Sequence, residues 1–271
     1  MYKLIALDMD GTLLRDDKTI SPAVKEAISK AKSKGVKVVL STGRPINGIN
    51  RYLKELNLLE DGDIASSFNG GLVLETKSEN VIYQCHMPKE SFEELYNLSQ
   101  ELNVHIHALT KDAVLTPNKD ISKYTVLEAF MNDIYLYYED SSKLIGSEDY
   151  IKIMFIDHPE KLDKAIEKLP SWLYEKYNVV RSADHFLEIL PKEVDKGLGL
   201  VMLADKLGIK IEETIGVGDA GNDLNLIKSA GLGVAMGNAF DFVKEAANYV
   251  AKTNEEDGVA EVINKFILEE Q

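Results

Sequence analysis

Short apolar runs alternate with amphipathic segments at the start of the chain. Leu4 to Leu7 is a continuous apolar run, which is the pattern of a strand buried on both faces. Residues 22–34 then carry apolar side chains at helical spacing, after Ser21 as a candidate N-cap and before Gly35 as a stop. A second apolar run covers residues 36–40. This succession predicts two parallel strands joined by a right-handed helical crossover.

The same alternation continues and then returns in the last third of the chain. The pattern predicts helices over 45–56, 196–207, 222–229 and 240–247, and strands over 64–67, 214–217 and 233–235. A final helix is expected after Asp257-Gly258. The hydrophobic pattern therefore predicts an α/β fold with a parallel sheet.

The aromatic content and the hydrophobic pattern of the chain change between residues 84 and 187. This stretch holds 13 of the 21 aromatic residues, and aromatic side chains favour strands that pack on one face. Helical patterns at 88–102 and 159–169 are mixed there with β-rich runs. We therefore predict an α+β domain over 84–187, inserted into a parallel α/β core formed by 1–83 and 188–271.

Composition narrows the range of partners and compartments. The formal net charge is −14, so the surface repels nucleic acid and anionic lipid, and we expect neither as a partner. No apolar run approaches the roughly 20 residues that span a bilayer, and Asp8 comes too early for a signal peptide. We therefore expect a cytoplasmic protein. The single cysteine, Cys85, is no basis for a disulfide or a metal site.

Polar side chains follow three of the predicted strands at the point where each strand ends. Asp8 and Asp10 follow the first strand, Thr42 and Gly43 follow the second, and the polar run 218–223 follows a later one. In open α/β sheets, ligands bind outside the carboxyl ends of the strands. We therefore expect the three clusters to build a single site.

The Asp8-x-Asp10 pair suits phosphoryl chemistry. Side chains at i and i+2 of an extended segment point to the same side, so one carboxylate can attack a phosphorus while the other handles protons. Gly11 lets the chain turn away, and Thr12 can tie the turn through its hydroxyl. An acidic Asx-type turn after the strand is the structural alternative. An EF-hand loop is excluded, because Gly11 falls at loop position 4 and Thr19 stands at position 12 in place of glutamate.

Residues 216–221 match the pattern G-x-G-x-x-G between a predicted strand and a predicted helix. Asp219 lies inside this loop and would place a carboxylate against a pyrophosphate, which disfavours a dinucleotide site. An acidic loop suits Mg²⁺, because hard cations prefer carboxylate oxygens. An Asp that only caps the strand-to-helix turn is the structural alternative.

Lys196 begins a predicted helix, where its charge opposes the helix dipole. The position is explained if the ammonium reaches a phosphate beside the helix N-terminus. Gly43 can likewise free backbone N–H groups for an anion. A solvated surface lysine and a plain strand-end hydroxyl at Thr42 are the structural alternatives.

Taken in chain order, these motifs resemble the haloacid dehalogenase superfamily, and most closely its Cof-type sugar-phosphate phosphatases. The resemblance covers the whole chain and is carried by Asp8-Met-Asp10-Gly-Thr12, Ser-Thr42-Gly43-Arg44, Lys196-Gly197 and Gly218-Asp219-Ala-Gly-Asn222-Asp223. Each motif alone is weak, but their joint presence in this order is highly specific. The resemblance implies a Rossmann-like core with an inserted α+β cap domain of the C2 type.

The resemblance also implies roles for individual residues. Asp8 would be the nucleophile and Asp10 the general acid and base of a phosphatase that acts on phosphate monoesters of small metabolites, sugar phosphates above all. Mg²⁺ would be held by Asp8, the backbone carbonyl of Asp10 and Asp219, with support from Asp223. The groups implied to hold the phosphoryl oxygens are the Met9 backbone N–H, Thr42, Gly43, Lys196 and Asn222.

Other functions use similar motifs. A phosphomutase would use the same Asp8 and return the phosphoryl group to a sugar, so it stays an alternative. A halide-releasing enzyme is disfavoured, because Asp10 is suited to protonate the leaving group of a phosphate ester. A silent binding module is disfavoured by the complete set of Asp8, Asp10, Lys196 and Asp219.

Overall fold

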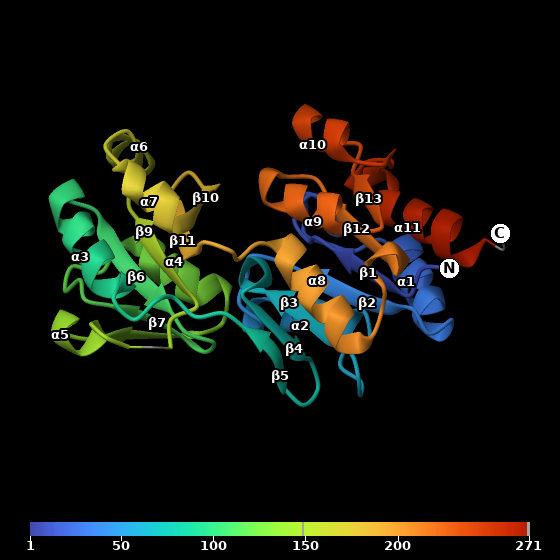
Figure 1. The fold of residues 1–271 in the computed structure, drawn as a ribbon, viewed down its shortest axis with the longest axis horizontal. Helices are drawn as coiled ribbons and strands as arrows, with labels where there is room; N and C mark the ends of the chain where they lie inside the picture. The colour runs from blue at the N-terminus through green and yellow to red at the C-terminus, as the bar shows by residue number, and fades with distance from the viewer. Residues whose placement is uncertain (148, 270–271) are drawn as a thin grey trace. The chain divides into compact units, whose positions relative to one another are not determined.

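The computed structural model describes residues 1–147 and 149–269, which form two compact units (Figure 1). The first unit consists of Met1–Gly43, Asn50–Tyr83 and the chain from Asp195 onward. The second unit consists of Arg44–Ile49 and Gln84–Val194. Within the described residues, no helix is both long and apolar enough to cross a bilayer.

The first unit is built on an eight-stranded sheet with the order β14-β13-β12-β1-β2-β3-β4-β5. Its strands are β1 (Leu4–Leu7), β2 (Lys37–Ser41), β3 (Ile64–Ser67), β4 (Leu72–Glu75), β5 (Val81–Gln84), β12 (Thr214–Gly218), β13 (Leu232–Ala235) and β14 (Tyr249–Val250). The strands from β14 to β3 are parallel, and β4 pairs antiparallel with β3. The predicted α/β fold with a parallel core sheet is confirmed.

Helices cover both faces of this sheet (Figure 1). They are α1 (Pro22–Ser33), α2 (Asn50–Glu55), α8 (Lys196–Leu207), α9 (Leu224–Ser229), α10 (Asp241–Ala246) and α11 (Gly258–Ile263). On one face, Leu200 and Leu203 of α8 pack with Leu4 and Ala6 of β1 in one apolar cluster. Burial on both faces explains why β1 is apolar along its whole length.

The neighbours of β1 determine where a ligand site can form. β1 lies between β12 and β2, and the crossovers on its two sides run in opposite directions across the sheet. Such a switch point leaves a crevice outside the carboxyl ends of the central strands. Asp8 follows β1 directly, and Asp219 directly follows β12.

The second unit contains a six-stranded sheet with the order β10-β11-β9-β6-β7-β8. Its elements are α3 (Ser91–Leu102), β6 (His105–Leu109), β7 (Ala113–Thr116), α4 (Lys123–Met131), β8 (Tyr135–Tyr138), α5 (Ser141–Leu144), β9 (Lys152–Ile156), α6 (Pro159–Ile166), α7 (Ser171–Lys176), β10 (Tyr177–Ala183) and β11 (Phe186–Pro191). The sheet is antiparallel except for the pair β7 and β8.

The two faces of this sheet differ in character. Ile153 and Phe155 of β9 pack with Phe92 and Leu95 of α3 in a large apolar core. Lys152 alternates with these residues and points to the other face, where Glu128 of α4 contacts it. The helix α4 therefore lies on the face opposite to α3.

Among the differences between the structure and the predicted bounds, two concern the helix after Gly43 and the end of the insertion. The helix predicted over 45–56 is a short 3₁₀ turn at Asn47–Ile49 followed by α2, because Pro45 and Gly48 disfavour a continuous α-helix there. The insertion was predicted to end at residue 187, whereas β11 pairs with both β9 and β10 and the second unit runs on to Val194. That this unit serves as a cap stays a prediction.

Candidate active site

Asp8 lies at the end of β1 with its carboxylate buried. Its backbone N–H donates to the carbonyl of Val217, 3.0 Å away, which ties the end of β1 to β12. The chain then reverses, because the N–H of Leu14 donates to the carbonyl of Met9 at 2.8 Å. Gly11 makes this reversal possible: its φ is +83°, and a Cβ there would collide with the carboxylate of Asp219.

Lys196 is fully buried at the first turn of α8, in the same unit as Asp8. Its ammonium donates to the Asp8 carboxylate and to Oδ1 of Asp223, the latter at 2.6 Å. Asp195 caps the helix by accepting from the N–H of Leu198 at 2.8 Å, and this cap positions Lys196. Lys196 is therefore not a solvated surface lysine.

Asp223 connects Lys196 to the loop after β12. Its Oδ2 accepts from the N–H groups of Asp219 and Ala220, each at 3.0 Å, while Oδ1 accepts from Lys196. Both carboxylate oxygens are thus engaged within the protein. A Cβ at Gly218 would collide with the Asp223 side chain, so the glycine lets that side chain approach the strand end.

Asp219 stands beside this pair and is partly exposed. Its Oδ1 accepts from the Thr12 hydroxyl at 2.8 Å, so Thr12 links two loops and does not simply tie its own turn. Asp8, Asp219 and Asp223 each present an oxygen within 4.8 Å of the others. Two of the three predicted strand-end clusters therefore converge.

The pKa values in this group reflect crowded negative charge. Burial and the nearby Asp223 raise the pKa of Asp8 to about 8, although Lys196 opposes the shift. Burial also raises the pKa of Asp219 to about 6, against the hydrogen bond from Thr12. Burial alone would lower the pKa of Lys196, but the contacts with Asp223 and Asp8 outweigh it and raise that pKa.

The chemistry of the donor set fits a divalent cation. When all three carboxylates are ionised, they carry two negative charges more than the ammonium of Lys196 balances, in a largely buried site. A hard cation such as Mg²⁺ takes carboxylate oxygens and would hold Asp8 and Asp219 in their ionised forms. Asp223 is less suited to direct coordination, because both of its oxygens already accept hydrogen bonds.

The second strand-end cluster contributes Thr42 and Gly43. The N–H of Thr42 donates to the carbonyl of Ser66 at 2.9 Å, and the carbonyl of Thr42 accepts from the N–H of Asn69 at 2.9 Å. A Cβ at Gly43 would lie 3.1 Å from Nδ2 of Asn69. Oδ1 of the same Asn69 accepts from Asn222 at 3.2 Å, so Asn69 connects this cluster with the loop after β12.

Two residues in this region, Lys18 and Asn69, were not singled out as functional from the sequence. Asp10 is partly exposed, and its Oδ1 lies 2.9 Å from the ammonium of Lys18. Asn69 has φ +54°, the left-handed region that Asn tolerates better than most residues. Asn69 precedes two glycines, a sequence typical of a turn, whereas nothing in the sequence pattern points to Lys18.

With this geometry in view, comparison with known proteins decides the family. The family sequence model of the haloacid dehalogenase-like hydrolases matches residues 5–263 of the chain. The chain belongs to this family. The hydrolase is 44% identical over 268 residues to YxeH of Bacillus subtilis (strain 168), whose name describes it as a phosphatase, and the match covers 99% of both chains. These findings confirm the predicted superfamily and the enzyme class.

Other relatives carry more specific names. The hydrolase is 34% identical to the 5-amino-6-(5-phospho-D-ribitylamino)uracil phosphatase YitU of Bacillus subtilis (strain 168), over 97% of each chain. Among solved structures, a haloacid dehalogenase-like hydrolase from Bacteroides thetaiotaomicron has a TM-score of 0.86 at 36% identity, covering 98% of this chain and 100% of that one. The subclass IIB sugar phosphatase BT4131 has a TM-score of 0.79 at 27% identity, with 97% and 98% covered.

Proposed function

We propose that the hydrolase is a Mg²⁺-dependent phosphatase that hydrolyses phosphate monoesters of small metabolites through an aspartyl-phosphate on Asp8. The observation that carries this proposal is the buried ammonium of Lys196, which contacts both Asp8 and Asp223 beside Asp219. A carboxylate that attacks a phosphate dianion meets charge repulsion, and fixed positive charge reduces it.

Asp8 is the proposed nucleophile. Its carboxylate oxygen forms a bond to phosphorus as the bond from phosphorus to the ester oxygen breaks. The leaving oxygen takes a proton from Asp10, and the alcohol departs. Water then attacks the same phosphorus, Asp10 accepts its proton, and inorganic phosphate leaves with Asp8 restored. In the structure the Asp10 carboxylate forms an ion pair with the ammonium of Lys18, 2.9 Å away, and this pair opens when Asp10 serves the leaving group.

The remaining residues hold the phosphoryl group and the cation. The proposed phosphate ligands are Lys196, the hydroxyl of Thr42, the backbone N–H groups of Gly43 and Met9, and Asn222. Mg²⁺, when bound by Asp8, Asp219 and the backbone carbonyl of Asp10, supplies positive charge to the phosphoryl oxygens. Asp223 supports both functions by fixing Lys196 and the backbone of Asp219.

The substrate class rests on the relatives. One relative is named for a phosphorylated ribityl compound and one structural neighbour is described as a sugar phosphatase. We therefore propose that the alcohol is a sugar or a polyol, and that the second unit acts as a cap over the core.

A screen for phosphate release tests the proposal. Phosphorylated sugars and polyols are supplied with Mg²⁺ and, in parallel, after chelation, to the wild-type protein and to Asp8→Asn. Release that needs both the cation and Asp8 is the expected result. Release that survives in Asp8→Asn would contradict the proposal. Turnover that depends on an added sugar bisphosphate would favour the phosphomutase.

A further inference from the structure

Lys18 is a cation on the accessible side of the candidate site. Its ammonium lies 2.9 Å from Oδ1 of Asp10, the proposed general acid and base, and the Lys18 side chain is 50% exposed. Both residues belong to the first unit, so that unit alone places them relative to each other. Lys196, in contrast, is fully buried between two carboxylates. The site thus includes an accessible cation as well as a buried one.

The backbone of Lys18 has a conformation that favours glycine. Its φ is +65°, in the left-handed region where a side chain costs energy. The turn is closed by two hydrogen bonds: the N–H of Lys18 donates to the carbonyl of Arg15 at 2.9 Å, and the N–H of Arg15 donates to the carbonyl of Thr19 at 3.0 Å. Glycine would form this turn at lower cost. A lysine held in such a conformation beside a proposed catalytic group indicates that its ammonium has a function.

The loop over residues 15–19 is held by the C-terminal part of the same unit. Asp257 accepts from the guanidinium of Arg15 at 3.0 Å, and Glu255 accepts from the N–H of Asp16 at 2.8 Å. These contacts tie the loop to a second segment of the unit. The backbone from which the lysine side chain projects is therefore fixed beside the proposed acid and base.

The ion pair of Lys18 with Asp10 opens during the proposed reaction. Asp10 has to turn from the ammonium to the leaving oxygen, which it approaches to about 2.6–3.2 Å. An aspartate side chain is short, so the ammonium and the leaving oxygen can be only a few atoms apart. The ammonium then loses its carboxylate partner, and a carboxylate of the substrate can take the same place.

We propose that Lys18 binds a carboxylate on the leaving group of the phosphate ester. This inference rests on the proposed phosphatase function and narrows its substrate class. The preferred substrate is the phosphate ester of a sugar acid or polyol acid, with the carboxylate on the carbon next to the one that bears the ester. The contact with Asp10 shows the chemistry that the ammonium accepts, because its partner there is a carboxylate oxygen.

The charge of the protein explains why an acidic substrate needs this cation. The formal net charge is −14, and the carboxylates of Asp8, Asp219 and Asp223 gather in the candidate site. A second negative charge on the substrate is repelled there unless a fixed cation pairs with it. Lys18 supplies that pairing, whereas an uncharged sugar or polyol gains nothing from it.

The test compares two three-carbon esters. 3-Phosphoglycerate carries the carboxylate, and glycerol 3-phosphate has a hydroxymethyl group in its place. Values of kcat and KM are measured with Mg²⁺ for the wild type, Lys18→Gln, Lys18→Arg and Lys77→Gln. Lys77 is the matched control, because it is a lysine of the first unit that is 53% exposed and also pairs with an aspartate. It follows β4, which runs antiparallel to β3 and so ends at the sheet edge away from the site.

We expect the wild type to prefer 3-phosphoglycerate. Lys18→Gln should lower the ratio of kcat/KM for the acidic ester to that for the neutral ester roughly 10-fold or more. The change should lie mainly in KM, because the ion pair is made in the ground state and the transition state alike. Lys18→Arg keeps the charge and should retain most of the preference, and Lys77→Gln should alter neither ester.

The other outcomes are distinct. Losses of equal size for both esters in Lys18→Gln would show that Lys18 acts only through Asp10, and would overturn the inference. It would also be overturned if the wild type prefers glycerol 3-phosphate, or if it hydrolyses other esters of the phosphate-release screen but neither of these two. If the wild-type protein hydrolyses no ester at all, the proposed phosphatase function fails and the inference with it.

Discussion

The ammonium of Lys196 lies 2.6 Å from a carboxylate oxygen of Asp223, and both side chains are fully buried. A buried ion pair of this kind is costly to assemble and more costly to break. In the hydrolase it joins the first turn of α8 to the loop after β12. The contact therefore fixes the position of the cation that also reaches Asp8.

Replacing Asp223 with Asn tests this structural role. The amide keeps the size of the side chain but loses its charge and turns an N–H₂ group toward either Lys196 or the N–H groups of Asp219 and Ala220. We expect the free energy of unfolding to fall by about 3 kcal/mol. Urea denaturation followed by circular dichroism measures it. Asp61→Asn is the control, because the Asp61 side chain is 89% exposed, and equal losses in the two variants would contradict the assigned role.

Asp219 should couple cation binding to stability. Burial raises the pKa of Asp219 to about 6, so at pH 7.5 its ionised form destabilises the cation-free fold. Asp219→Asn should therefore stabilise the cation-free protein by roughly 1 to 2 kcal/mol, after allowance for solvent screening. The same variant should lose the rise in melting temperature that Mg²⁺ gives the wild type. An undiminished response of Asp219→Asn to Mg²⁺ would exclude Asp219 as a ligand.

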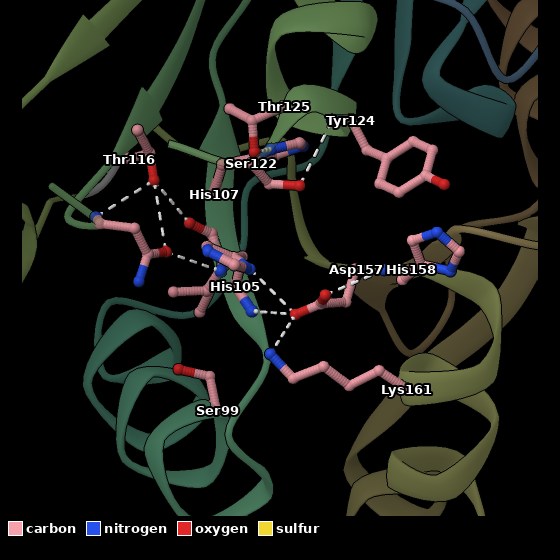
Figure 2. Close-up of polar contacts among 12 residues, drawn as sticks. Ser99, His105, His107, Thr116, Ser122, Tyr124, Thr125, Asp157, His158 and Lys161 are labelled. Carbon is pink, nitrogen blue, oxygen red and sulfur yellow. Dashed lines mark hydrogen bonds and ion pairs between the residues drawn. The ribbon is translucent and has the colours of Figure 1, made fainter. Parts of the chain in front are cut away.

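His107 should make the second unit sensitive to acid. Burial, and the nearby charge of Lys152, lower its pKa from 6.5 to about 3. Between these two pH values His107 is protonated in the unfolded chain and neutral in the folded protein, where it lies beside Thr125 (Figure 2). The folded protein therefore keeps its full stability above pH 6.5 and loses stability as the pH falls below that value. The loss from pH 7 to pH 5 should be about 2 kcal/mol.

His107→Gln removes this contribution and should flatten the dependence of unfolding free energy on pH. The single tryptophan, Trp172, lies in α7 of the second unit, so its fluorescence reports unfolding where His107 is buried. His158→Gln is the control, because His158 is exposed. Identical pH dependences for the two variants would show that His107 does not carry the effect.

The sequence predicted the parts of the site that depend on strand order. Asp8 and Asp219 follow strands that prove to be adjacent, so their convergence follows from the topology of parallel sheets. The contact of Lys18 with Asp10 was not predictable, because an irregular loop brings the two side chains together and no periodic sequence pattern describes such a loop. Asn69 was visible as a turn residue, but its contact with Asn222 spans 153 positions in the chain.

The helix α4 shows why a pattern can fail. It was not predicted, because a hydrophobic pattern identifies a helix by its apolar buried face. In α4 the buried side chains include Thr125 and Glu128, while Phe130 is exposed. Glu128 is buried because Lys152, distant in sequence, lies beneath it. A buried partner such as Lys152 is known only when the structure shows which strand lies beneath the helix.

The central claim is that phosphate is transferred to Asp8. Asp10→Asn keeps the nucleophile but lacks the base that activates water, a group typically worth about 10²- to 10⁴-fold in rate. A leaving group such as p-nitrophenolate departs without a proton, so this variant should still be phosphorylated and then stall.

The direct measurement is rapid-quench labelling with ³²P-labelled p-nitrophenyl phosphate, followed by peptide mapping of both Asp variants. We predict label on Asp8 in Asp10→Asn and none in Asp8→Asn. Equal labelling of the two variants, or label on any residue other than Asp8, would contradict the proposed mechanism.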